Sequence, residues 1–125
     1  MDLSAFDLKG KVALITGGAH GIGFSIAEGM AKCGATICFN CSSEASLEKG
    51  LAAYKAVGID AHGYAADVSD EDAVNAMVAK IKAEVGPVDI LVNNAGLMKR
   101  VPMVEMSHAD FMRVIDCLLY TSRCV

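Results

Sequence analysis

One short segment constrains the fold of this chain more than any other, because it joins a strand pattern to a helix pattern through glycines. Residues 11–16, "KVALIT", form an apolar run with β-branched residues that is typical of a buried strand. Residues 16–23, "TGGAHGIG", follow directly and place Gly17, Gly21 and Gly23 at G-x-x-x-G-x-G spacing. The next residues show helical periodicity as far as Gly34, which can end a helix. The segment predicts a strand, a tight turn and a helix in that order.

The same alternation of short and long patterns continues along the chain. Further strands are predicted at 35–40, 59–67 and 87–92, and further helices at 42–58, 69–86 and from 107 onward. Such alternation implies parallel strands joined by right-handed crossovers, with helices on both faces. We therefore predict an α/β fold, a Rossmann-type doubly wound parallel sheet in strand order 3-2-1-4. The chain is expected to stop after the fourth strand and the start of the following helix.

The predicted helices carry start signals and apolar stripes. A serine cap opens the helix at 42–58, and Ser69 with Asp72 and Ser107 with Asp110 have capping-box spacing. The stripes expected to face the sheet are Leu47, Leu51 and Tyr54 in one helix, and Val74, Met77, Val78 and Ile81 in the next.

Polar and glycine-rich segments follow each predicted strand. In a doubly wound sheet, ligands bind at the carboxyl ends of the strands, where the strand order reverses. The segments 17–23, 40–42, 67–68 and 93–96 should therefore lie along one edge. The predicted cofactor-binding residues there are Gly17, His20, Gly21, Ile22, Gly23, Cys41, Ser42, Asp67, Val68, Asn94 and Gly96.

The glycine turn suits a diphosphate for a physical reason. Glycines let the backbone turn sharply and let a phosphate approach it, while the free N–H groups at the start of the next helix attract negative charge. The alternative is that the glycines serve only the geometry of the turn. Asp67 could accept a hydrogen bond from an adenine amino group or could cap the helix that starts near Asp70. Asn94 and Gly96 could offer amide donors to a ribose or could simply form a turn.

Three motifs together, "TGGAHGIG", Asp67 and "NNAG", resemble those of the short-chain dehydrogenase/reductase family, and the resemblance runs from about Leu8 to Asp116. Within that family, "AHGYAADVSDEDAVNAMV" and "ILVNNAGLMKRVPMVEM" are similar to the gluconate 5-dehydrogenase branch. The resemblance implies a nicotinamide cofactor, a sugar-acid substrate (gluconate and 5-ketogluconate) and a homo-oligomeric parent protein. Another keto reductase of the family, such as a 3-oxoacyl reductase, is the alternative.

The residues after the second strand bear on which cofactor is used. An acidic residue there would bind the ribose 2′-hydroxyl of NAD and repel the 2′-phosphate of NADP. This chain has "NCSS" at 40–43, and His20 in the glycine turn could face the 2′-phosphate or only solvent. NADP(H) is therefore favoured, and NAD(H) is left open. Arg100 could pair with a substrate carboxylate or belong to a solvated basic pair with Lys99.

The family's catalytic set of serine, tyrosine and lysine is not recognised here, so no catalytic residue is predicted. A tyrosine followed four residues later by lysine would protonate the substrate carbonyl. Tyr54 is instead followed at that spacing by Gly58, and Tyr64 by Val68. We expect this chain to be inactive by itself. A module that binds NADP(H) without turning it over is the alternative from another functional class.

The last residues, "CLLYTSRCV" at 117–125, depart abruptly from the family pattern. Their reverse translation matches the end sequence of a transposase-made sequencing library. We interpret 1–116 as the N-terminal part of a dinucleotide-binding domain and 117–125 as a non-native tail. A sheet cut off in this way is expected to be marginally stable, because an edge and apolar helix faces stay uncovered.

Composition excludes several other functions. A net charge of −4 argues against nucleic-acid binding, and no apolar run is long enough to span a membrane. The acidic start of the chain lacks a secretory signal, which predicts a cytoplasmic protein. Cys38 and Cys41 form a C-x-x-C, but their spacing puts them on opposite sides of a strand, so no metal site is predicted.

Overall fold

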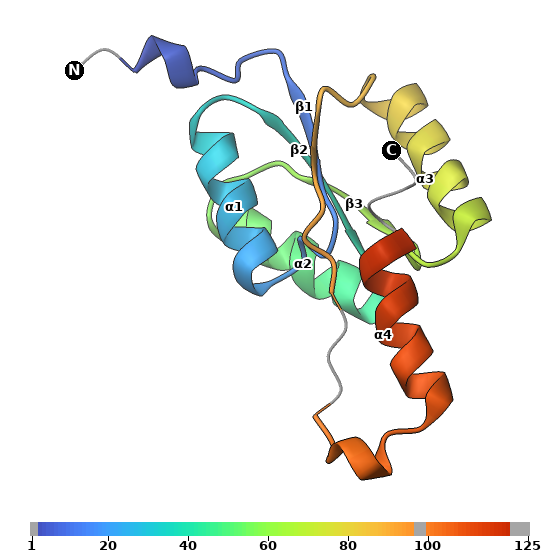
Figure 1. The fold of residues 1–125 in the computed structure, drawn as a ribbon. Coiled ribbons are helices and arrows are strands. Elements are labelled where there is room, and N and C mark those ends of the chain that lie inside the picture. Colours follow the sequence, from blue (N-terminus) through green and yellow to red (C-terminus); the bar gives the residue numbers. More distant parts are fainter. Residues whose placement is uncertain (1–2, 97–99, 121–125) are drawn as a thin grey trace.

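A computed structural model describes residues 3–96 and 100–120 of the chain, with side chains as far as 118. Its centre is a four-stranded parallel sheet in the order β3-β2-β1-β4 (Figure 1). The strands are β1 (Val12–Ile15), β2 (Thr36–Cys41), β3 (His62–Ala65) and β4 (Ile90–Val92). The helices are α1 (Gly21–Lys32), α2 (Glu44–Ala56), α3 (Glu71–Glu84) and α4 (His108–Tyr120), with single 3-10 turns η1 (Ser4–Phe6) and η2 (Met103–Glu105). The predicted fold class and strand order are confirmed.

The strand register brings the carboxyl ends together at one edge. Ile15 at the end of β1 pairs with Phe39 on one side and Val92 on the other. Cys41 at the end of β2 pairs with Ala65 at the end of β3. The turns that follow the four strands therefore meet, as the predicted position of the site requires.

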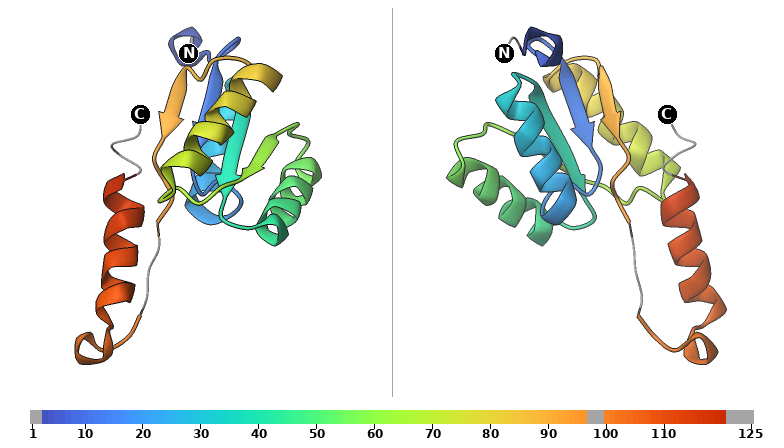
Figure 2. Two further views of the ribbon diagram at one scale, coloured as in Figure 1. Left: turned by 90° about the vertical axis from the view of Figure 1, so that its right-hand side faces the viewer. Right: turned by 60° about the vertical axis from the view of Figure 1, so that its left-hand side comes forward.

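The two faces of the sheet have separate cores. Helices α1 and α2 cover one face, where Phe39 and Tyr54 are fully buried, and α3 covers the other, where Met77 and Ile81 are buried (Figure 2). Helix α4 stands apart from both layers and extends beyond the carboxyl edge. Cys41 lies in the first core and Cys38 in the second, so the two thiols point to opposite faces as predicted.

Two details of the predicted stripes are wrong. Leu51 and Val78 are 38% and 41% exposed, because each lies at the margin of its helix stripe, while Tyr54 and Ile81 are fully buried. The predicted cap of α3 also shifts by one residue. The Asp70 carboxylate, rather than the Ser69 hydroxyl, accepts the Ala73 N–H at 3.1 Å.

The remaining helix starts agree with the sequence patterns. Ser43 caps α2 by accepting the Ser46 N–H at 3.2 Å. The Ser107 hydroxyl accepts the Asp110 N–H at 3.1 Å and donates to the Asp110 carboxylate at 2.7 Å. Helix α4 continues without a break through Cys117 to Tyr120, and the last five residues of the predicted non-native tail lie outside the described residues. None of the helices described at 3–96 and 100–120 is long and apolar enough to cross a membrane.

Candidate nucleotide-binding site

The glycine turn needs glycine at position 17 for two reasons. Gly17 has a φ of +65°, a left-handed conformation that other residues adopt at a cost. A Cβ atom there would also lie 2.9 Å from the Ala95 Cα. Gly21 has a φ of +61° but faces open space, so its requirement comes from the backbone alone.

Gly23 makes room for a neighbouring turn. A Cβ atom at Gly23 would lie 2.5 Å from the Asn94 side-chain nitrogen and 2.7 Å from the Gly17 carbonyl oxygen. These contacts give Gly17 and Gly23 a structural role, and the approach of a phosphate to the glycine turn stays a prediction. At these two positions the absence of a side chain lets the 94–95 turn pack against the glycine turn.

A hydrogen-bond network joins these two turns. The Thr16 hydroxyl oxygen accepts the N–H groups of Asn94 at 3.1 Å and Ala95 at 3.0 Å. The Asn94 side-chain amide donates to the carbonyls of Thr16 at 3.1 Å and Gly17 at 3.2 Å. The Asn94 side-chain amide is thus engaged within the protein, and the predicted contact of Asn94 with a ribose stays a prediction.

Asn40 connects the glycine turn to the segment that follows β3 at the carboxyl edge of the sheet. Its side chain is 1% exposed, accepts the Gly17 N–H at 3.0 Å and donates to the Ala66 carbonyl at 2.7 Å. Its own carbonyl accepts the Gly18 N–H at 3.1 Å. The sequence pattern marked Asn40 only as a non-acidic residue after the second strand and did not indicate this structural role.

The start of α1 offers unused backbone donors. The first N–H groups of any α-helix have no acceptor within the helix. His20 occupies the N-cap position in an extended conformation and makes no side-chain cap hydrogen bond. No acidic residue lies in the first turn, and Ile22 is 75% exposed. An anion could therefore reach these N–H groups and the positive end of the helix dipole.

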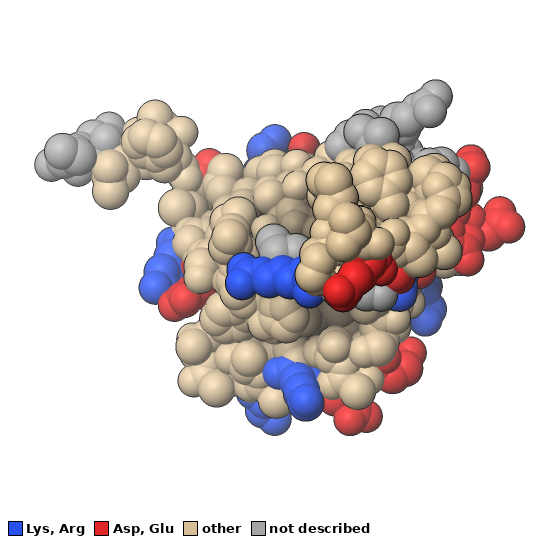
Figure 3. Space-filling model, turned by 60° about the horizontal axis from the view of Figure 1, so that its bottom comes forward, with Lys and Arg blue, Asp and Glu red and all other residues tan. Residues whose placement is uncertain are grey.

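A pocket of about 200 Å³ opens at the carboxyl edge, and the face that carries it is hollowed near its middle (Figure 3). Seven of the predicted residues line it, namely Gly17, His20, Cys41, Ser42, Asp67, Val68 and Gly96. Gly21, Ile22, Gly23, Asn94 and Arg100 do not line it. The structure thus brings together the segments after β1, β2, β3 and β4.

Asp67 is held as a carboxylate at the rim of this pocket. One of its oxygens accepts both the N–H and the hydroxyl of Ser69, at 2.9 and 2.7 Å. These hydrogen bonds lower the pKa of Asp67 against the opposing effect of burial, and the charge of Arg113 adds a lesser lowering effect. Asp67 does not cap α3, because Asp70 does. Its second oxygen can accept a hydrogen bond from a ligand.

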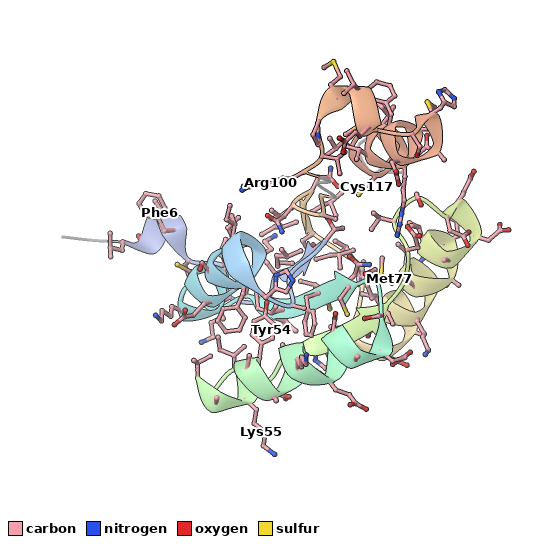
Figure 4. The ribbon with its side chains drawn as sticks, turned by 90° about the horizontal axis from the view of Figure 1, so that it is seen from below. Phe6, Tyr54, Lys55, Met77, Arg100 and Cys117 are labelled. Carbon is pink, nitrogen blue, oxygen red and sulfur yellow. The ribbon has the colours of Figure 1, made fainter. Side chains whose placement is uncertain are left out.

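The pocket includes residues that the sequence patterns did not indicate. Ser46 contributes from α2, and Arg113 and Cys117 from α4. Figure 4 looks onto this edge and shows Cys117 on α4 and Arg100 on the segment beyond β4. Local periodicity marks 107–116 as a helix but carries no information about a contact with position 67. The predicted role of Arg100 stays a prediction.

The parallel sheet, its strand order and the glycine turn at its carboxyl edge define the Rossmann-like class of α/β proteins. The chain belongs to the short-chain dehydrogenase family, whose model, described as short chain dehydrogenase, matches residues 11–121. The resemblance to this family that the motifs predict is therefore confirmed.

Several members of the family and solved structures are similar to this chain over most of its length. The 2-dehydro-3-deoxy-D-gluconate 5-dehydrogenase of Formosa agariphila is 50% identical over 117 residues, which cover 93% of this chain and 44% of that protein. The 2-keto-3-deoxy-D-gluconate dehydrogenase structure from Streptococcus agalactiae has a TM-score of 0.85 and 56% identity, covering 96% of this chain and 47% of that one. A gluconate 5-dehydrogenase structure from Burkholderia cenocepacia, in complex with NADP and tartrate, has a TM-score of 0.81 and 35% identity. The match covers 98% of this chain and 50% of that one. The chain thus spans about half the length of these relatives, or less.

Proposed function

We propose that this chain forms the NADP(H)-binding part of an oxidoreductase that interconverts a hydroxyl and a keto group at carbon 5 of a gluconate-type sugar acid. The observation that carries the cofactor part is the pocket at the carboxyl edge. The proposal for the substrate is supported by the names of the relatives from Formosa agariphila and Burkholderia cenocepacia, which share a 5-dehydrogenase activity on such acids.

The residues along the carboxyl edge would fit a dinucleotide in one orientation. The pocket between the ends of β2 and β3 would take the adenosine end, with Asp67 accepting from the adenine amino group. The N–H groups at the start of α1 would hold the diphosphate, and Gly96 would border the nicotinamide side. When bound, the nicotinamide would donate or accept the hydride.

The lining of the pocket favours NADP(H) over NAD(H). His20, Ser42 and Ser46 line it and offer one imidazole and two hydroxyl groups, all of which can donate to a phosphate. Residues 40–43 contain no carboxylate that would repel a 2′-phosphate. Two solved structures that are similar to this chain contain NADPH: a blue fluorescent protein from a metagenomic library and the L-sorbose reductase of Gluconobacter frateurii. They support the preference for NADP(H).

Titration of the chain with NADPH and NADH tests the cofactor preference. We expect NADPH to bind at least about tenfold more tightly, since charge-assisted hydrogen bonds to the 2′-phosphate are worth about 1.5–3 kcal/mol. Ser42→Asp should reverse the preference by placing a carboxylate in the pocket. Ala45→Asp is the matched control, because it adds the same charge on an exposed residue that does not line the pocket. Tighter NADH binding by the unmodified chain would contradict the preference.

Reading the source DNA across the codon of Asp116 tests the enzymatic part. Continuation into a serine and a Tyr-x-x-x-Lys motif would support the oxidoreductase, and the product of that reading frame should reduce a 5-keto sugar acid with NADPH. A stop codon directly after Val125 in independent reads would instead support a module that binds NADP(H) without turning it over.

A further inference from the structure

A buried tyrosine reaches the glycine turn from a distant helix. Tyr54 lies in α2 and is 0% exposed, and its hydroxyl donates to the Gly18 carbonyl at 2.6 Å across 36 residues of sequence. Figure 4 shows Tyr54 between α1 and α2, in contrast to its neighbour Lys55, which points away from the molecule.

The ring of Tyr54 is fixed on both sides. Its centroid lies 4.6 Å from that of Phe24 in α1 and 4.8 Å from that of Phe39 in β2, with interplanar angles of 38° and 36°. Tilted aromatic pairs at such distances stabilise the fold by more than the burial of their apolar surface alone. The hydroxyl is therefore held at a defined place relative to the turn.

Gly50 explains how α2 comes close enough for this contact. A Cβ atom at Gly50, one helical turn before Tyr54, would lie 2.9 Å from the Phe39 ring and 3.0 Å from the Ala19 Cβ. A glycine inside a helix costs about 1 kcal/mol relative to alanine. Its position against Ala19 and Phe39 indicates that this cost is offset by the close approach of α2 to the glycine turn.

Peptide geometry links the hydrogen bond to the pocket. The Gly18 carbonyl and the Ala19 N–H belong to one planar trans peptide, so they point in opposite directions. The N–H groups of Gly17 and Gly18 are already taken by Asn40. Ala19 is thus the next donor along the turn, and it lines the pocket.

We propose that Tyr54 is a positioning residue for the diphosphate: by holding the Gly18 carbonyl against α2, it aims the Ala19 N–H and the donors that follow it toward the cofactor. This inference rests on the proposed function, because it presumes that the pocket binds a dinucleotide. Burial raises the pKa of Tyr54 to about 12, so the hydroxyl stays a donor throughout the neutral range. Tyr54 itself does not line the pocket.

Two ligands separate positioning from general loss of structure. NADP⁺ contains the diphosphate, whereas adenosine 2′-monophosphate contains the adenosine and the 2′-phosphate alone. We expect Tyr54→Phe to weaken NADP⁺ binding by about 3- to 10-fold, the effect of one lost hydrogen bond, and to change binding of the monophosphate less than about twofold. Isothermal titration calorimetry on the chain measures both constants.

Tyr64→Phe is the matched control, because it removes the hydroxyl of another buried tyrosine whose partner, Glu84 at 2.9 Å, lies outside the pocket. It should leave both constants unchanged.

The outcomes distinguish the two levels of the proposal. If the unmodified chain binds both ligands and Tyr54→Phe weakens them equally or not at all, the positioning role is overturned while the proposed function stands. If the unmodified chain binds neither ligand, the proposed function fails and the positioning role fails with it.

Discussion

The two faces of the sheet are both packed cores, yet they relate to the site in different ways. On the α1/α2 face, Phe24, Phe39 and Tyr54 stack together, and the tyrosine hydroxyl ends on the glycine turn. On the α3 face the buried residues are mainly aliphatic or sulfur-containing, and the Tyr64 hydroxyl ends on Glu84. The tyrosine hydroxyl of the first face therefore reaches the glycine turn, whereas the tyrosine hydroxyl of the α3 face binds a residue that does not line the pocket.

The largest effect is expected where α1 packs against the glycine turn. Gly23→Ala would place a Cβ atom 2.5 Å from Asn94 and 3.0 Å from the Gly18 Cα, which cannot be relieved by a side-chain rotation alone. We expect the free energy of unfolding to fall by about 3–5 kcal/mol and NADP⁺ binding to be lost. Denaturant unfolding and calorimetric titration measure the two effects.

Gly29→Ala provides the control for this variant. Gly29 lies in the same helix, and a Cβ atom there would meet nothing within 4 Å beyond its chain neighbours and the backbone of its own helix. We expect this change to raise stability by up to about 1 kcal/mol and to leave cofactor binding unchanged. Similar losses for the two variants would show that the close packing at Gly23 is not the cause.

A cavity on the opposite face should reduce stability without affecting the site. Ile81 in α3 is fully buried, and Ile81→Ala is expected to lower the free energy of unfolding by about 2–4 kcal/mol. Because Ile81 itself does not line the pocket, the dissociation constant for NADP⁺ should stay within about twofold of its original value. A large loss of affinity in the folded variant would contradict the separation of the two faces.

A smaller effect is expected from the two tyrosine hydroxyls. Tyr54→Phe and Tyr64→Phe should each lower the free energy of unfolding by about 1 kcal/mol, since each removes one hydrogen bond. The two variants should then differ in their affinity for NADP⁺ but not in their free energy of unfolding. Thermal and denaturant unfolding of both variants, compared side by side, would detect an unequal loss.

The smallest effect concerns the charge of Asp67. Its pKa is lowered by the hydrogen bonds from Ser69, so the folded state is favoured while the carboxylate is ionised. This contribution is present above the ordinary pKa of about 4 and is lost as the pH falls through the lowered pKa. Ser69→Ala should raise the pKa of Asp67 toward its ordinary value, which an NMR titration of the carboxyl carbon measures. An unchanged pKa would assign the shift to another cause.

Much of the fold could be predicted because it depends on patterns within short segments. The periodicity of 11–16 and 35–40 indicated strands, and parallel connections then placed the turns at one edge. The cap of α3 was misassigned because Ser69 and Asp70 are both good capping residues. The structure resolves the choice by a contact within the preceding turn, since the Ser69 hydroxyl donates to Asp67 and leaves Asp70 to cap the helix.

The site was harder to predict because its hydrogen bonds join residues far apart in sequence. The roles of Thr16, Asn40 and Asn94 depend on partners up to 79 residues away, and no local pattern encodes such pairings. The contribution of Arg113 depends on how α4 lies against the edge. The assignment of 117–125 as a non-native tail stays a prediction.

The hydrogen bonds between Thr16 and Asn94 have a consequence for how the protein is made. Strand β1 pairs with β2 early in the chain, but the residues that secure the glycine turn from the other side follow Thr16 by 78 positions. At about 5–20 residues per second, a ribosome needs about 4–16 s to add them. During that interval the nascent glycine turn lacks the hydrogen bonds that Asn94 and Ala95 supply, so its completion waits for the segment after β4.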